Sequence, residues 1–190
     1  MKLLRMRISF NAPFTIAFST VAVAVYFLFQ MDGTIPRIFK LEGDFQLTNW
    51  KWYVSTVGYT MGHVSMTHLI GNVSIILLLG PFVERRYGVK RLLGMFIITG
   101  ILTALVHIIF WEHTLIGASG IVFMFFVLSS LIDMRGNKIP LTFILIAVLF
   151  IGQEIVQSFQ SDSISQFAHI SGGVMGAVFG FAYRNKTSFN

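Results

Sequence analysis

Long apolar stretches alternate with short charged segments along the whole chain. Six windows contain no Asp, Glu, Lys or Arg: residues 8–31, 52–83, 92–111, 113–132, 139–153 and 163–183. A helix that crosses the hydrocarbon core of a bilayer needs roughly 20 residues, with a usable range of about 17–25. Five of the six windows are long enough to meet this requirement directly. The pattern therefore predicts an all-α membrane protein built as a bundle of six transmembrane helices.

The charges at the window edges give approximate bounds for these helices. The predicted spans cover residues 13–30, 63–83, 91–111, 117–133, 139–158 and 165–183. The fifth window is short, but Pro140 suits the first turn of a helix, and the helix can continue past Glu154 toward the membrane surface. The apolar run of the first span continues beyond its small residues, so we interpret it as a retained helix and not as a cleaved signal peptide.

The segment between the first two spans, residues 31–55, is predicted to be an outer loop. It mixes Trp, Tyr, Phe and Ile with charged residues, a composition that is typical of the headgroup zone of a membrane. No repeat, linker or low-complexity tract divides the sequence. We therefore predict a single domain over residues 1–190.

Composition supports a membrane protein, and the positions of the charges predict its orientation. Hydrophobic residues make up 55% of the chain and charged residues 12%, whereas soluble domains carry about 25% charged residues. Of the 14 Lys and Arg residues, eleven lie before the first predicted span, after the second and fourth spans, or in the C-terminal tail. Because Lys and Arg in short loops tend to stay in the cytoplasm, both termini are predicted to be cytoplasmic.

The charge and the cysteine count also exclude several classes of function. The net charge of +6 is spread over segments next to spans, where it would face anionic lipid headgroups. It forms no basic stripe, so we expect the lipid bilayer as a partner and no nucleic acid. The chain has no cysteine, which excludes disulfides, thiolate catalysis and metal sites with cysteine ligands.

Polar side chains inside spans are costly and often mark a functional site. His68 and Asn72 are four residues apart and share one face of the second span. In the sixth span, His169 lies on the same helix stripe as three glycines, at positions 172, 176 and 180. A glycine stripe allows another helix to approach closely, although packing alone would explain the glycines.

The fourth span begins at GASG, residues 117–120. Free backbone N–H groups and the positive end of the helix dipole at such a position suit a developing oxyanion. If the motif stood alone, we would interpret Ser119 as an N-capping serine. The predicted topology, however, brings Ser119, His68 and His169 to one depth, near the outer ends of their spans. A serine, an imidazole and an amide at one level are the components of an acyl-transfer site.

Four motifs occur in an order that resembles the rhomboid family of intramembrane serine proteases, in its six-span bacterial form. They are HVSMTHLIGN at 63–72, ERRYG at 84–88, GASG at 117–120 and AHISG at 168–172. The resemblance covers about residues 14–184. One departure concerns the outer loop, where many rhomboids have Trp-Arg and this chain has Trp50-Lys51. Lys does not replace Arg at a bidentate or stacked site, which leaves the role of this loop open.

The resemblance implies a role for each matching residue. Ser119 would be the nucleophile and His169 its general base, in a dyad without an acidic partner. Asn72, His68 and the backbone N–H groups of Ser119 and Gly120 would stabilise the oxyanion. Phe123, one helical turn after Ser119, would hold the imidazole by ring packing. Supporting roles would fall to His63, Gly117 and Gly172, and structural roles to Glu84, Arg86, Gly176 and Gly180.

The function implied is cleavage of single-span membrane proteins in or near their transmembrane segments, without a cofactor or a metal. One alternative is a metal or haem protein that uses His63, His68, His107 and His169, but no HExxH spacing is present. A second alternative is a non-cleaving rhomboid-like protein that binds transmembrane helices. The sequence does not specify the substrate, the cleavage-site preference, the oligomeric state or the regulation.

Overall fold

The structure is a computed structural model that describes residues 10–30, 35–134, 136, 138–158 and 166–185. Seven α-helices lie in this part of the chain: α1 (Pro13–Gln30), α2 (Trp50–Gly58), α3 (Met66–Tyr87), α4 (Val89–Phe110), α5 (Ser119–Ser130), α6 (Leu141–Ser158) and α7 (Gln166–Ala182). Two short 3-10 helices, η1 (Arg37–Phe39) and η2 (Tyr59–Met61), flank α2 in the chain. The only β-pairing among the described residues is an isolated antiparallel bridge between Leu41 and Leu115. The predicted all-α fold is confirmed for these residues.

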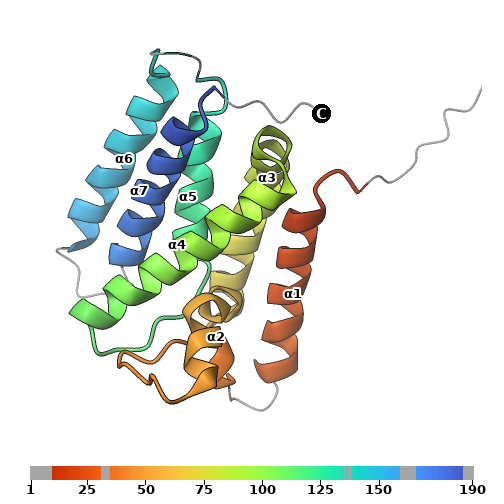
Figure 1. The fold of residues 1–190 in the computed structure, drawn as a ribbon, viewed down its shortest axis with the longest axis vertical. Helices are drawn as coiled ribbons and strands as arrows, with labels where there is room; N and C mark the ends of the chain where they lie inside the picture. Colours follow the sequence, from red (N-terminus) through yellow and green to blue (C-terminus); the bar gives the residue numbers. More distant parts are fainter. Residues whose placement is uncertain (1–9, 31–34, 135, 137, 159–165, 186–190) are drawn as a thin grey trace, which may run out of the picture.

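The helices form a bundle whose two ends differ (Figure 1). The start of α1, the α3–α4 turn, the connection from α5 to α6 and the end of α7 lie at one end. The opposite end, which we call the α2 end, carries α2, η1 and the segment between α4 and α5. This grouping brings segments that are far apart in the sequence to a common level.

Several helix bounds differ from the predicted spans, and α3 also ends at Tyr87, four residues beyond the predicted end. Helix α3 begins at Met66, three residues after the predicted start, and α5 is shorter than the predicted segment 117–133. The segment predicted as an outer loop contains η1 and most of α2. Among the described residues, α3 and α4 are the two helices both long and apolar enough to cross a membrane. Shorter apolar helices cover Pro13–Phe29, Ser119–Ser130 and Leu141–Gly152.

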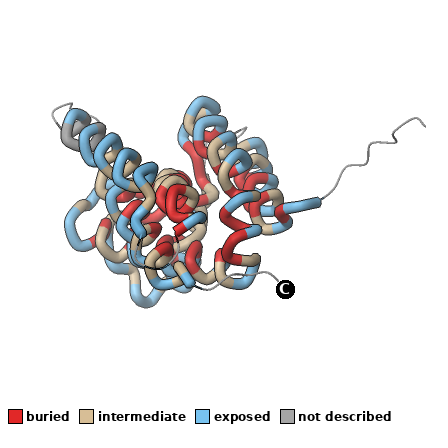
Figure 2. Tube along the Cα trace, turned by 90° about the horizontal axis from the view of Figure 1, so that it is seen from above, coloured by how far each residue is buried: buried red, intermediate tan, exposed pale blue. Residues whose placement is uncertain are grey.

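Helix α5 is the most enclosed helix of the bundle. Two thirds of its residues are buried and none is exposed. The partly buried ones, Ser119, Phe123, Phe126 and Ser129, are three or four residues apart and share one face of the helix. Met124, Phe125 and Leu128 pack in one core cluster with residues of α1, α3 and α4. Seen along the bundle, buried segments gather in the middle and exposed ones lie outside (Figure 2). A site at the start of α5 is therefore surrounded by other helices.

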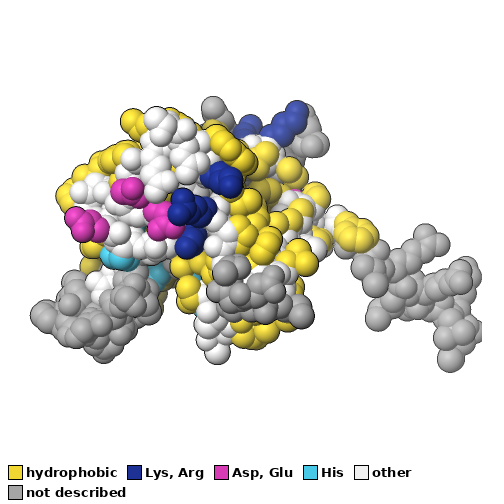
Figure 3. Space-filling view, turned by 90° about the horizontal axis from the view of Figure 1, so that it is seen from below, with side chains coloured by type: hydrophobic (Ala, Val, Ile, Leu, Met, Phe, Trp, Pro, Cys, Tyr) yellow, Lys and Arg dark blue, Asp and Glu magenta, His cyan; other side chains and the backbone are white. Residues whose placement is uncertain are grey.

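The flanks of the bundle are apolar and exposed. Figure 3, which views the α2 end, shows acidic and basic side chains grouped on that end and hydrophobic side chains beside them. Exposed apolar residues on the outer faces of α3 and α6 include Leu78, Phe82, Val148 and Leu149. Exposed apolar area of this extent marks an interaction surface, which for long apolar helices is the hydrocarbon of a membrane.

The Glu-x-Arg-x-Gly motif joins three parts of the bundle at the end opposite α2. Glu84 is buried and caps α1: its carboxylate accepts hydrogen bonds from the N–H groups of Phe14 and Thr15 at 3.0 and 2.9 Å, and from Thr15 Oγ1 at 2.8 Å. Arg86 donates to the carbonyl oxygens of Ile132 and Arg184, each at 3.0 Å. Gly88, with φ +79°, makes the turn between α3 and α4.

Replacing Glu84 by alanine should therefore destabilise the fold. The variant leaves three donors at the start of α1 without their acceptor, and it removes a negative charge from a helix N-terminus. We expect a loss of about 2–4 kcal/mol in the free energy of unfolding, measured by thermal or denaturant unfolding in detergent. Glu84→Gln, which keeps one acceptor oxygen, should lose less. Equal stability of Glu84→Ala and the unmodified protein would contradict this assignment.

Candidate functional site

Ser119 is the first residue of α5, and Ala118 occupies the N-cap position. The interpretation of Ser119 as an N-capping serine is therefore wrong. The first helical hydrogen bond of α5 runs from Val122 N–H to the Ala118 carbonyl at 3.0 Å. The N–H groups of Ser119, Gly120 and Ile121 precede this bond, so the helix itself provides them with no acceptor. The start of α5 thus offers backbone donors beside a partly exposed serine.

The segment that leads into Ser119 is held by hydrogen bonds from three directions. Leu115 exchanges two backbone hydrogen bonds with Leu41, both at 2.9 Å. The N–H of Gly117 donates to the Tyr59 carbonyl at 3.0 Å. Nε2 of His107, at the end of α4, lies 2.7 Å from the carbonyl oxygen of His113. The position of Ser119 therefore depends on backbone contacts that no sequence motif indicates.

Gly117 lies directly against the ring of His68. Its φ of +119° belongs to a region that L side chains rarely adopt. A Cβ at this position would lie 2.5 Å from Cε1 and 2.7 Å from Nε2 of His68. The absence of a side chain lets the imidazole approach the backbone two residues before Ser119.

The glycine stripe of α7 is the face that packs on α5. A side chain at Gly172 would overlap the backbone of Gly120, and one at Gly176 would lie 2.8 Å from the Met124 carbonyl oxygen. Gly180 packs in the same way against Leu131. The two backbones are in close contact along this stripe, as expected for small residues at a helix interface. The start of α5 therefore lies beside the turn of α7 that carries His169.

His169 packs against an aromatic ring of α5. The centroids of Phe123 and His169 are 4.4 Å apart, with an interplanar angle of 36°. His68 of α3 lies against Gly117, just before the same helix. Side chains from α3, α5 and α7 thus meet at one level of the bundle.

Asn72 is buried and pairs with His63. The Asn72 Nδ2 atom lies 3.1 Å from His63 Nε2, and His63 Nδ1 lies 3.3 Å from the Met61 carbonyl oxygen. Because a carbonyl can only accept, Nδ1 is the protonated nitrogen of a neutral His63 ring, and its Nε2 accepts from the Asn72 amide. This pairing orients the Asn72 side chain and leaves its second N–H for another acceptor.

The structure groups most of the residues singled out from the sequence. Around the start of α5 it gathers His68, Phe123, His169 and the glycines at 117, 120 and 172. His63 pairs with Asn72. The ring centroids of His63 and His68 are 5.0 Å apart. Glu84 and Arg86 lie at the opposite end of the bundle. His107 does not join this group: it packs with Trp111 and His113. Among the described residues, no group of three or more His, Cys, Asp or Glu could hold a metal ion.

The Trp-Lys pair of the outer segment differs from a buried Trp-Arg arrangement. Trp50 is exposed, and Lys51 Nζ lies 5.9 Å from the centroid of its ring. The buried tryptophan is Trp52, whose Nε1 donates to the Asp44 carbonyl at 2.9 Å. Trp52 therefore anchors α2 to the preceding loop, a contact that the sequence motif did not indicate.

Comparison with known proteins gives a consistent family. The profile of the Rhomboid domain matches residues 49–186. The chain is 29% identical over 161 residues to Rhomboid-related protein 1 of Caenorhabditis elegans, a match that covers 79% of this chain and 44% of that protein. It is 24% identical over 179 residues to Rhomboid protease GlpG of Yersinia pestis, covering 89% of this chain and 62% of that protein. The chain therefore spans only about half of the length of these relatives.

Proposed function

Because the chain belongs to the rhomboid family of membrane proteins, we propose that it is an intramembrane serine endopeptidase. Its substrates would be single-span membrane proteins, cleaved in or near the transmembrane segment. The observation that carries the proposal is the surroundings of Ser119. The residue two before it packs on His68, and the residue after it packs on the backbone of α7 beside His169. Both histidines therefore lie beside the first turn of the helix that begins at Ser119, which supports the proposal.

In the proposed reaction, Ser119 Oγ attacks the carbonyl carbon of the scissile peptide bond, and His169 accepts the hydroxyl proton. The tetrahedral intermediate collapses when the C–N bond breaks and the imidazolium returns the proton to the leaving amine. An acyl-enzyme on Ser119 remains. Water then attacks the ester with His169 again as the base, which releases the new carboxyl end and restores the serine.

The negative oxygen of each intermediate needs preorganised donors. The backbone N–H groups of Ser119 and Gly120 lie in the first turn of α5, where the helix dipole adds to their effect. The second N–H of the Asn72 amide and the ring of His68 would provide side-chain donors. Gly117 supports this group because it leaves space for His68, and Gly172 supports it because it brings α7 close.

We further propose that the chain is a single rhomboid domain over 1–190 with six spans. The outward-facing segment would be the α2 end, so that both termini lie in the cytoplasm of a bacterial cell and the site opens to the outer side. The proposal is supported by the grouping of the start of α1, the α3–α4 turn and the end of α7 in Figure 1, because eleven of the 14 cations lie in the sequence next to these elements or after α5. No cofactor and no metal take part in the proposed reaction, and metal analysis of the purified protein tests that part.

Replacing His63 by phenylalanine should lower the cleavage rate without unfolding the protein. Phenylalanine fills a similar volume but cannot accept the hydrogen bond from Asn72, so the amide loses its fixed orientation. We expect the cleavage rate to fall about tenfold. This loss is smaller than the roughly 10²–10³-fold fall in rate that follows removal of a complete oxyanion donor. The check is a double-mutant cycle with Asn72→Ala. If the two changes are additive, His63 does not act through Asn72.

The experiment that tests the proposed function is cleavage in liposomes. The protein and a single-span test substrate with small residues at the outer end of its span are reconstituted together, and fragments are mapped by mass spectrometry. We expect wild type to cleave and Ser119→Ala to be inactive. Ser129→Ala is the matched control, because Ser129 lies on the same helix and its Oγ donates only to the Phe126 carbonyl. A folded wild-type protein that binds the substrate and leaves it intact would favour the non-cleaving alternative.

A further inference from the structure

Three aromatic rings from three helices pack together beside the first turns of α5. The Phe123 ring of α5 contacts both His169 of α7 and Phe150 of α6. Its centroid is 4.4 Å from that of His169 and 4.3 Å from that of Phe150, and the rings are tilted by 36° and 37°. These spacings are slightly shorter than the range of about 4.5–7 Å that is usual for aromatic pairs. Phe150 thus contacts the ring that holds the imidazole.

The backbone of α7 fixes Phe150 from a second side. A Cβ at Gly173 would lie 2.9 Å from Cε1 of Phe150, so this ring occupies the space that a side chain at 173 would need. Phe150 is therefore held between Phe123 and the α7 backbone. The Phe150 ring thus occupies space that Phe123 would need in order to turn toward α6.

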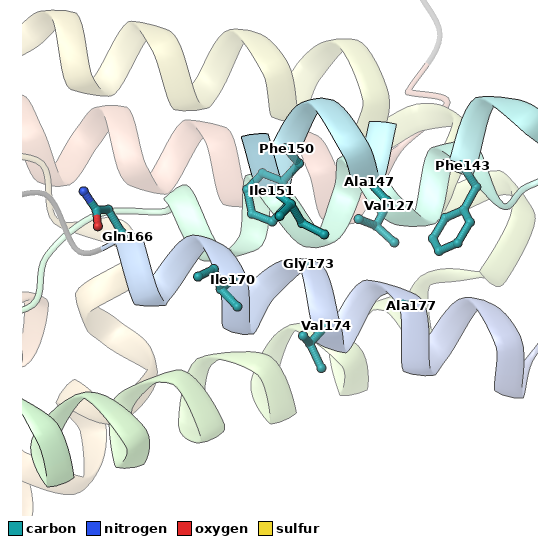
Figure 4. A pocket seen from close by; sticks show the side chains of 10 residues that line it. All are labelled: Val127, Phe143, Ala147, Phe150, Ile151, Gln166, Ile170, Gly173, Val174 and Ala177. Atoms are coloured by element: carbon teal, nitrogen blue, oxygen red, sulfur yellow. The ribbon is translucent and has the colours of Figure 1, made fainter. Parts of the chain in front are cut away.

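Elsewhere α6 leaves a cavity between itself and α7. The cavity has a volume of about 530 Å³ and is lined by apolar side chains, with Gln166 at one end (Figure 4). Phe150 and Gly173 both line it, and Val148 and Leu149, next to Phe150 in sequence, are exposed on the outside of α6. Because α6 and α7 do not close over this cavity, the ring of Phe150 is a principal contact between α6 and the site.

From this geometry we propose that Phe150 is a positioning residue for His169 and that Phe150 acts through the ring of Phe123. The inference rests on the proposed function, because the three rings would orient His169 to accept the proton of Ser119. Phe123 packs on the ring of His169, and it can hold the imidazole toward Ser119 only while its own χ angles are fixed. Phe150 fixes them. Removal of the third ring lets Phe123 reach other rotamers, and His169 then spends part of its time in orientations that cannot accept the serine proton.

The test separates positioning of His169 from admission of a substrate helix. A small fluorophosphonate probe reacts with an activated serine and does not require a transmembrane substrate to enter the bundle. We expect Phe150→Leu, which keeps apolar bulk and removes the ring, to lower the rate of probe labelling about three- to tenfold. The rate of substrate cleavage should fall by the same factor, with the KM for the substrate unchanged. Phe150→Tyr keeps the ring and should restore both rates, because its hydroxyl can extend toward the adjoining cavity.

Leu149→Ala is the matched control. It changes the neighbouring residue of α6, whose side chain is 72% exposed, and it should label and cleave at the wild-type rate. Thermal unfolding of each variant in detergent shows whether the fold is retained. Gly173→Ala is the second variant: its Cβ displaces the Phe150 ring while the ring is kept, and it should slow labelling as Phe150→Leu does.

Two results would overturn the proposal. One is labelling of Phe150→Leu and Gly173→Ala at the wild-type rate. The other is a change in cleavage or in KM with unchanged labelling, because Phe150 would then act on substrate entry. If the proposed function is wrong, the result differs: the folded wild-type protein itself reacts with neither the probe nor the substrate.

Discussion

Replacing His169 by alanine should lower the rate of substrate cleavage about 10⁴-fold or more. The serine hydroxyl is a poor nucleophile without a base, and removal of one member of a serine–histidine pair costs nearly as much as removal of both. The fold should survive, because alanine is smaller and the His169 ring is only partly buried. The measurement is the cleavage rate of a reconstituted single-span substrate, together with the thermal unfolding midpoint of the variant.

The matched control for His169 is His113→Ala. His113 is an exposed histidine in the segment before α5. Its backbone carbonyl accepts the hydrogen bond from His107, which the substitution retains, and only the ring contact with His107 is lost. This variant should cleave at close to the wild-type rate. A His169→Ala protein that is folded and within tenfold of wild type would show that another group accepts the serine proton.

Adding one methyl group at Gly172 should disrupt both the fold and the reaction. A Cβ there would lie 2.7 Å from the carbonyl carbon of Gly120 and 2.9 Å from its Cα. These are backbone atoms in the first turn of α5, so no side-chain rotation can relieve the overlap, and α5 and α7 must separate. We expect Gly172→Ala to lose about 1–3 kcal/mol in the free energy of unfolding. Because Ser119 and His169 lie on the two helices that separate, the cleavage rate should fall at least tenfold.

Gly71→Ala is the control for Gly172→Ala. Gly71 lies within α3, and a Cβ there meets nothing within 4 Å, so the same chemical change adds helix propensity without a clash. Its stability should equal or exceed that of wild type. If Gly172→Ala is as stable and as active as Gly71→Ala, the close contact between α5 and α7 is not required.

The sequence predicted the parts of the site that depend on helix periodicity. Spacings of three and four residues put Gly172, Gly176 and Gly180 on one face, and the structure has that face against α5. One turn separates Ser119 from Phe123, and the ring of Phe123 lies on His169. Such relations within one helix follow from 3.6 residues per turn, whatever the rest of the chain does.

Contacts between different helices, and between helices and loops, could not be predicted from the sequence in this way. The contact of Phe150 with Phe123 joins residues 27 positions apart, and nothing in an apolar span distinguishes a ring that faces the site from one that faces lipid. The Tyr59 carbonyl that holds Gly117 carries no sequence signal, because any residue provides a carbonyl. Helix α2 was missed because its charged and aromatic residues suggested an interfacial loop, whereas Asn49 caps a short helix there.

The central claim is that Ser119 is an activated alcohol whose reactivity depends on His169. The most direct measurement is peptide mapping of the folded, detergent-solubilised protein after reaction with a fluorophosphonate probe, in wild type and in His169→Ala. We expect one phosphonyl adduct, on the peptide that contains Ser119, and a labelling rate that falls sharply without the imidazole. An adduct on a different serine, or equally fast labelling of Ser119 in the two proteins, would contradict it.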